Sequence, residues 1–81
     1  MHIHVIVGDN IRCLRARRQW SQEELGSRTG LNHDYLGRLE RGLENIGVDN
    51  LSKIAAVFGI EPFNLLIENF CSADNVLRNA A

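Results

Sequence analysis

Hydrophobic side chains recur along most of this chain at intervals of three and four residues, which is the spacing of one helix face. A first helix is predicted from Val7, because Ile11 and Leu14 follow on the same face with arginines between them. Residues 1–7 instead alternate loosely between apolar and polar side chains and carry no helix-start signal. This alternation favours a short strand before the first helix.

Two short helices follow, and both have capping signals. Ser21 and Glu24 match the capping box, in which each side chain bonds the backbone amide of the other residue. Gly30 ends this second helix. Asn32 is a good N-cap for a third helix, which Gly42 terminates as the first residue beyond it. Two short helices joined by a tight glycine-containing turn are typical of a helix-turn-helix.

The second half of the chain predicts two more helices. Residues 48–58 carry an apolar stripe and are followed by Gly59, which ends the fourth helix. Pro62 suits the first position of a fifth helix, where a missing N–H is tolerated. Its buried side is predicted to consist of Phe63, Leu66 and Ile67. The tail from residue 69 is polar, so any helix there is marginal. The predicted fold is therefore all-α, with five short helices.

Size and composition narrow the function classes. The chain has 81 residues, of which 44% are hydrophobic and 23% charged, as expected for one small globular domain. No apolar run approaches the roughly 18 residues of a membrane helix, and no signal peptide opens the chain. No phosphate-binding glycine loop or nucleophile motif is present, and the chain is too small to enclose a usual substrate pocket. We therefore expect neither an enzyme nor a membrane protein.

Cysteine and histidine usage suggests no metal site. Cys13 and Cys71 are too few for a disulfide scaffold, which favours reduced cysteines and a cytoplasmic protein. His2 and His4 form a pair two residues apart, but no second pair with metal-ligand spacing follows. The sequence therefore predicts neither a metal nor another cofactor.

Charge is unevenly distributed, although the formal net charge is only −1. Residues 1–42 contain seven basic and five acidic side chains, whereas residues 43–81 contain two basic and five acidic ones. Eight of the nine basic residues are arginine, whose planar group suits phosphate and guanine. This asymmetry is compatible with a DNA-binding protein whose acidic end faces away from DNA.

Several joined motifs resemble the XRE family of lambda-repressor-like helix-turn-helix regulators. They are Val7-Gly8-Asp9-Asn10-Ile11-Arg12, Ser21-Gln22-Glu23-Glu24-Leu25, Gly30-Leu31-Asn32-His33-Asp34-Tyr35-Leu36 and Leu39-Glu40-Arg41-Gly42. The resemblance spans about residues 7–68, which leaves residues 1–6 as an extension and residues 69–81 as a tail with a possible part in dimerisation. Tyr35 and the Glu40-Arg41-Gly42 stretch are especially similar to the small controller proteins of restriction–modification systems.

The resemblance implies roles for individual residues, with the third helix entering the major groove. The base-reading positions are His33, Asp34 and Arg38. The phosphate-binding positions are Gln22, Arg41 and Asn45. A structural ion pair between the first and third helices is formed by Arg15 and Glu40.

Helical periodicity supports the base-reading assignment, because positions 33, 34, 37, 38 and 41 share one face of the third helix. Arg38 can form two hydrogen bonds with the O6 and N7 atoms of guanine. Two residues depart from the family pattern. Asp34 is a carboxylate where a hydroxyl or amide is usual, and Gly26 replaces a typical alanine, which is expected to weaken the second helix. The fourth helix also lacks a hydroxyl cap.

These features together predict a homodimeric, sequence-specific regulator of transcription that binds double-stranded DNA at a pseudo-palindromic operator. One such helix gives few base contacts, so two half-sites are needed to single out an operator. The predicted dimer interface consists of Phe63, Leu66, Ile67 and Phe70. No small-molecule effector is expected. The alternative is an antitoxin-like module that uses the same fold to bind another protein.

Overall fold

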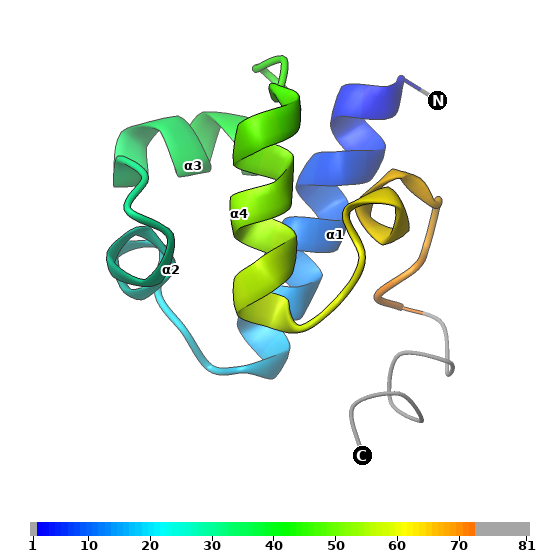
Figure 1. Ribbon diagram of the computed structural model, residues 1–81. Helices are drawn as coiled ribbons and strands as arrows, with labels where there is room; N and C mark the ends of the chain where they lie inside the picture. Colours follow the sequence, from blue (N-terminus) through cyan, green and yellow to red (C-terminus); the bar gives the residue numbers. More distant parts are fainter. Residues whose placement is uncertain (1, 73–81) are drawn as a thin grey trace.

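Five helical segments follow one another in residues 2–72, the part of the chain that the computed structural model describes (Figure 1). They are α1 (Ile3–Arg17), α2 (Gln22–Thr29), α3 (His33–Glu40), α4 (Val48–Phe58) and the 3-10 helix η1 (Pro62–Leu66). The all-α prediction is confirmed within these residues, but only four of the five segments are α-helices. Residue 1 and most of the predicted tail, residues 73–81, lie outside the described part.

The strand predicted for residues 1–7 is wrong, because α1 begins at Ile3. Ile3 lies one helical turn before Val7 on the same face of α1; Val7 is 2% exposed, whereas Ile3 at the start of the helix is 45% exposed. The first turn also packs on the end of α3, where a Cβ on Gly42 would lie 3.0 Å from a methyl group of Val5. This tertiary contact outweighs the strand preference of the β-branched residues.

The predicted helix caps are largely present. Ser21 Oγ accepts a hydrogen bond from the Glu24 amide at 2.9 Å, but the Glu24 carboxylate pairs with Arg28 at 2.8 Å and does not close the capping box. Asn32 Oδ1 accepts from an amide of the first turn of α3 at 2.7 Å. Gly42 follows α3 with φ +73°, the left-handed conformation that favours glycine. Local sequence signals thus fix both ends of α3.

The core lies between α4 and the other segments. In Figure 1, α4 runs down the middle of the molecule, with α2 and α3 to its left and α1 and η1 to its right. Each described segment contributes apolar side chains that are fully or almost fully buried, including Ile11, Leu25, Leu36, Leu39, Ile54 and Leu65. This shared core holds α2 and α3 in a fixed relative position.

Two glycines permit close approach of backbone segments. A Cβ on Gly8 would clash with the carbonyl oxygen of Leu39, so α1 crosses the end of α3 at a distance that only glycine permits. A Cβ on Gly26 would lie 2.7 Å from the carbonyl oxygen of Leu31. Gly26 was expected only to weaken α2, but the tight turn into α3 requires it.

The register of the fifth segment differs from the prediction. Phe63, Leu66 and Ile67 are 59%, 41% and 45% exposed, whereas Leu65 is fully buried. The segment is a 3-10 helix, which has three residues per turn, and an α-helical spacing therefore misassigns its faces. Phe70, predicted for the dimer interface, is only 5% exposed and belongs to the core.

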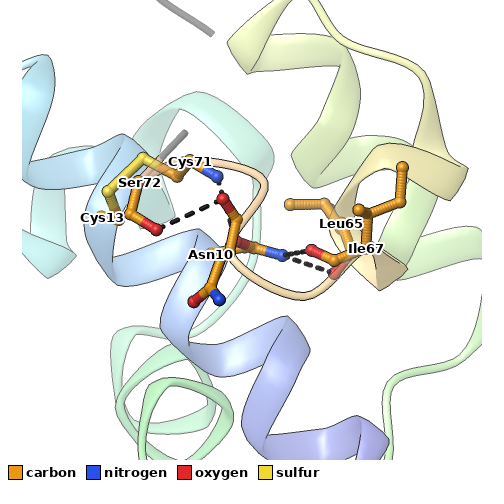
Figure 2. The surroundings of a disulfide bond; sticks show 7 residues. Asn10, Cys13, Leu65, Ile67, Cys71 and Ser72 are labelled. Atoms are coloured by element: carbon orange, nitrogen blue, oxygen red, sulfur yellow. Dashed lines mark hydrogen bonds between the residues drawn. A yellow bond between two sulfur atoms is a disulfide. The ribbon is translucent and has the colours of Figure 1, made fainter. Parts of the chain in front are cut away.

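A disulfide joins Cys13 in α1 to Cys71 (Figure 2). The two Cα atoms are 5.9 Å apart, although the residues are 58 positions apart in sequence. The buried side chain of Asn10, one turn before Cys13, holds the same segment. Its Nδ2 atom donates to the carbonyl oxygens of Leu65 at 3.0 Å and Ile67 at 2.9 Å, while its Oδ1 atom accepts from the Cys71 amide at 3.2 Å. The chain after η1 is thus fastened to α1.

The prediction of reduced cysteines is therefore wrong, since both are in the disulfide. The low cysteine count correctly indicates that the fold is not a disulfide scaffold, but it cannot reveal whether two cysteines meet. Their meeting depends on the path of the chain after η1, which the Asn10 hydrogen bonds fix.

We expect removal of the disulfide to destabilise the protein measurably. Replacing both cysteines with alanine, Cys13→Ala with Cys71→Ala, should lower the free energy of unfolding by about 2–4 kcal/mol, because a cross-link of this span restricts the unfolded chain. Urea unfolding with and without dithiothreitol measures the effect. The reductant should destabilise the wild type and leave the double variant unchanged, and equal midpoints for all four samples would contradict a stabilising disulfide.

Candidate nucleic-acid interface

The exposed face of α3 gathers most of the residues predicted to contact DNA. Asn32 starts this eight-residue helix, and Leu36 and Leu39 hold its other face in the core. The exposed face and the start of α2 line a shallow surface hollow, whose polar residues are Gln22, His33, Asp34, Arg38 and Arg41. The fold therefore brings together all three predicted base-reading residues and two of the three predicted phosphate-binding ones.

The buried carboxylate of Glu40 lies beneath this surface and is held in place by an arginine side chain. Its carboxylate is 3% exposed and receives two hydrogen bonds from Arg15, from Nε at 2.7 Å and from Nη2 at 2.8 Å. The same guanidinium donates to the carbonyl oxygen of Trp20 at 2.9 Å, and Arg12 donates to the backbone oxygen of Glu40 at 3.3 Å. Arg15 and Glu40 thus form an ion pair that ties α1 to α3. The hydrogen bond to Glu40 raises the pKa of Arg15 above its usual range, although partial burial opposes the shift.

Gln22 lies across α3, where the same carboxylate holds its side chain. Its Nε2 atom donates to Glu40 Oε1 at 3.1 Å. Its side-chain oxygen lies 3.4 Å from the position that a Cβ of Gly37 would occupy. Gly37 therefore leaves room for the Gln22 amide, and this space lies between α2 and α3 at the edge of the hollow.

The charged side chains of α3 have acidic neighbours. His33 Nε2 lies 3.3 Å from Asp34 Oδ1, a contact that is an ion pair only when the imidazole is protonated. Arg38 Nε lies 2.6 Å from a carboxylate oxygen of Glu44 in the loop after α3. Glu44 was not among the residues predicted from the sequence. It lies six residues after Arg38, so their contact follows from the turn geometry and not from helical spacing.

The two other predicted phosphate-binding residues and two aromatic side chains have defined positions in the structure. Arg41 and Asn45 are both exposed, at the end of α3 and in the following loop. The Tyr35 hydroxyl accepts a hydrogen bond from Asn50 Nδ2 at 3.1 Å, which ties α3 to α4. Trp20 stacks on Phe58 with ring centroids 5.5 Å apart, so its role is packing.

Two further findings concern other kinds of site. No helix in residues 2–72 is long and apolar enough to span a bilayer. Within the same residues, no three histidine, cysteine or acidic side chains come close enough together to hold a metal ion.

The sequence that contains the two short helices matches a known family. A family model described as helix-turn-helix matches residues 11–65. The chain belongs to the XRE-type helix-turn-helix family. The resemblance that the sequence motifs predicted is therefore confirmed.

Several relatives of this helix-turn-helix chain have names that describe regulators. It is 35% identical over 65 residues to the "Neisseria hypothetical transcription factor" of Neisseria meningitidis serogroup B, and the match covers 80% of this chain and 61% of that protein. It is 33% identical over 66 residues to the control protein C.BamHI of Bacillus amyloliquefaciens, with 80% of this chain and 82% of that protein covered. The chain thus spans less than two thirds of the Neisseria protein.

Solved structures of two proteins named as a controller and a regulator have the same fold. The restriction–modification controller protein C.AhdI from Aeromonas hydrophila superposes with a TM-score of 0.73 and 39% identity, over 76% of this chain and 94% of that one. SinR, a master regulator of biofilm formation solved in complex with DNA, superposes with a TM-score of 0.72 and 31% identity, over 75% and 98% of the two chains. The similarity to controller proteins that the sequence predicted is also confirmed.

Neutralising the buried carboxylate should destabilise the helix-turn-helix. Glu40→Gln leaves the guanidinium of Arg15 without its counter-charge, so we expect the free energy of unfolding to fall by about 3 kcal/mol. Asp9→Asn makes the same chemical change in an exposed ion pair with Arg12, at 2.8 Å, and should cost less than about 1 kcal/mol. Urea unfolding of both variants tests the contrast, and a similar loss for the two would refute the structural role of Glu40.

Proposed function

We propose that this chain is a sequence-specific regulator of transcription that binds a pseudo-palindromic DNA operator as a homodimer. The observation that carries the proposal is the exposed face of α3, where Arg38 lies beside the other predicted base readers while Leu36 and Leu39 anchor the opposite face. The relatives support it: one is named as a transcription factor, two as controllers, and SinR was solved with DNA.

In the proposed complex, α3 enters the major groove. Arg38 would contact the O6 and N7 atoms of a guanine, and His33 and Asp34 would reach neighbouring base edges. Asp34 lies in the first turn of α3, and its carboxylate can accept a hydrogen bond from the N4 amino group of cytosine. These contacts would determine which sequence is bound.

Phosphate contacts would fix the orientation of α3. Gln22, Arg41 and Asn45 are the proposed contacts, and they lie at the start of α2, at the end of α3 and in the loop after it. Glu40 already orients the Gln22 amide, which retains a second N–H for a phosphate oxygen. Such contacts position the protein but carry no base identity.

The proposed dimer interface is the apolar surface of η1 and the residue after it, formed by Phe63, Leu66 and Ile67. Phe70 is no longer part of it, because that side chain is buried within the protomer. A twofold axis through this surface would place two copies of α3 on two half-sites. The antitoxin-like alternative receives no support from the relatives named above.

Because the proposed target is DNA, we also propose a cytoplasmic location. Disulfides are rare in that compartment, where thiol reductants compete with them. Exchange requires access of a thiolate to one of the two sulfur atoms; Cys71 is fully buried, whereas Cys13 is only partly buried and lines a surface hollow. Alkylation of intact cells at low pH, followed by mass spectrometry, measures the redox state there.

Base reading is tested with two duplexes. One is selected by the wild-type protein from a random pool and serves as the operator, and the other is its scrambled counterpart. Arg38→Ala should weaken operator binding by about 1–3 kcal/mol per half-site and change binding of the scrambled duplex much less. Fluorescence anisotropy at one fixed salt concentration measures both affinities. An equal loss on the two duplexes would identify Arg38 as a phosphate contact instead.

Gln22→Ala is the control for phosphate contacts, and it should weaken binding of both duplexes alike. The logarithm of the wild-type affinity should also fall with the logarithm of salt concentration, with a slope of about −2 or steeper for a dimer. A wild-type protein with a flat salt response and no preference between the duplexes would refute the proposed function.

The dimer is tested by placing a charge in its proposed apolar interface. Sedimentation at micromolar concentration should give twice the monomer mass for the wild type, and Leu66→Asp should shift the protein toward monomer because it buries a carboxylate. Leu43→Asp is the matched control, since Leu43 is also exposed, at 66%, but lies in the loop after α3. Dissociation by both variants, or by neither, would argue against the η1 interface.

A further inference from the structure

The contact between Arg38 and Glu44 is unexplained by the packing of the domain. At 2.6 Å it is the shortest ion pair in residues 2–72, yet both side chains are partly exposed, at 44% and 32%. An exposed pair of this kind adds little to stability. It does, however, hold the side chain proposed to read a guanine, so it can act on DNA recognition.

The backbone places Glu44 beside Arg38. After α3, the left-handed conformation of Gly42 reverses the chain, and the Leu43 amide donates to the carbonyl oxygen of Arg38 at 2.9 Å. The next residue is Glu44, whose carboxylate reaches back to the Arg38 side chain. The pair therefore follows from a turn that is fixed independently of DNA.

The carboxylate occupies only one edge of the guanidinium. Arg38 donates to Glu44 through Nε, and within the described residues its two Nη groups make no hydrogen bond. A guanine edge needs two N–H donors, for O6 and N7, and the Nη groups can supply both. The ion pair and the guanine contact are thus compatible, and the first restricts the rotamers of the side chain that makes the second.

The same carboxylate opposes phosphate binding by Arg38. Its negative charge partly neutralises the guanidinium and is repelled by the DNA backbone. On non-cognate DNA, where Arg38 would otherwise gain affinity from a phosphate, Glu44 reduces that gain. On the operator, the guanine edge offers neutral acceptors, and the contact is retained.

We propose that Glu44 is a positioning residue that sets sequence specificity by holding Arg38 for guanine and keeping it from phosphates. This inference rests on the proposed function. It assigns the discrimination between operator and non-cognate DNA to a pair of residues, only one of which would touch a base.

The test compares wild type and Glu44→Gln on the selected operator and its scrambled duplex at fixed salt. We expect binding of the scrambled duplex to tighten and binding of the operator to change little. Their affinity ratio should fall about tenfold, equivalent to about 1.4 kcal/mol, which lies within what one bidentate guanine contact provides. Selection from the random pool with the variant should also relax the preference at one base-pair position in each half-site. An effect on folding alone would not change one base position.

Two control variants separate this mechanism from a general charge effect. Glu24→Gln removes the same charge from another partly exposed ion pair, in which Glu24 lies 2.8 Å from Arg28. This variant should tighten binding of both duplexes equally. Arg38→Ala with Glu44→Gln should have the same affinity ratio as Arg38→Ala alone, because Glu44 acts through Arg38. A lower ratio for the double variant would overturn the inference.

The remaining outcomes separate the inference from the proposed function. If the wild type discriminates between the duplexes and Glu44→Gln keeps the same ratio, the role of Glu44 is refuted and the proposed function stands. The role of Glu44 is likewise refuted, and the proposed function stands, if Glu44→Gln tightens binding of both duplexes equally, as is expected of Glu24→Gln. If the wild type itself does not discriminate, the proposed function fails.

Discussion

The buried carboxylate of Glu40 connects the three helices on which the proposed DNA-binding surface depends. It is the last residue of α3, it receives two hydrogen bonds from Arg15 in α1, and it orients Gln22 at the start of α2. A buried charge is tolerated only when its oxygens are fully satisfied, so this arrangement admits few alternatives. The relative position of α2 and α3 is therefore fixed by electrostatics as well as by the apolar core beneath them.

The parts of the fold that could be predicted from the sequence are those whose determining signals are local. Asn32 and Gly42 mark the ends of α3 within a few residues of the helix itself, and the 3.6-residue period identifies its exposed face. The features that could not be predicted are those in which a residue contacts a partner far away in the sequence. The burial of Phe70 and the meeting of Cys13 with Cys71 depend on a chain path that returns to α1 more than 50 residues later.

The candidate site shows the same division. His33, Asp34 and Arg38 could be placed on one face because helical spacing alone decides their positions. The contact of Arg38 with Glu44 could not, since it depends on the reversal of the chain at Gly42. Periodicity predicts which side chains lie on the exposed face of α3, whereas the turn geometry determines what else those side chains touch.

The disulfide also has a topological consequence. Cys13 and Cys71 close a covalent ring that contains the whole helix-turn-helix, from the end of α1 to the segment after η1. A single cut by a protease anywhere in this ring leaves the two pieces joined until the bond is reduced. Force applied at the two ends of the chain would likewise pass through the sulfur–sulfur bond and bypass α2, α3 and α4. The covalent path of the force thus avoids the helices of the proposed DNA-binding surface.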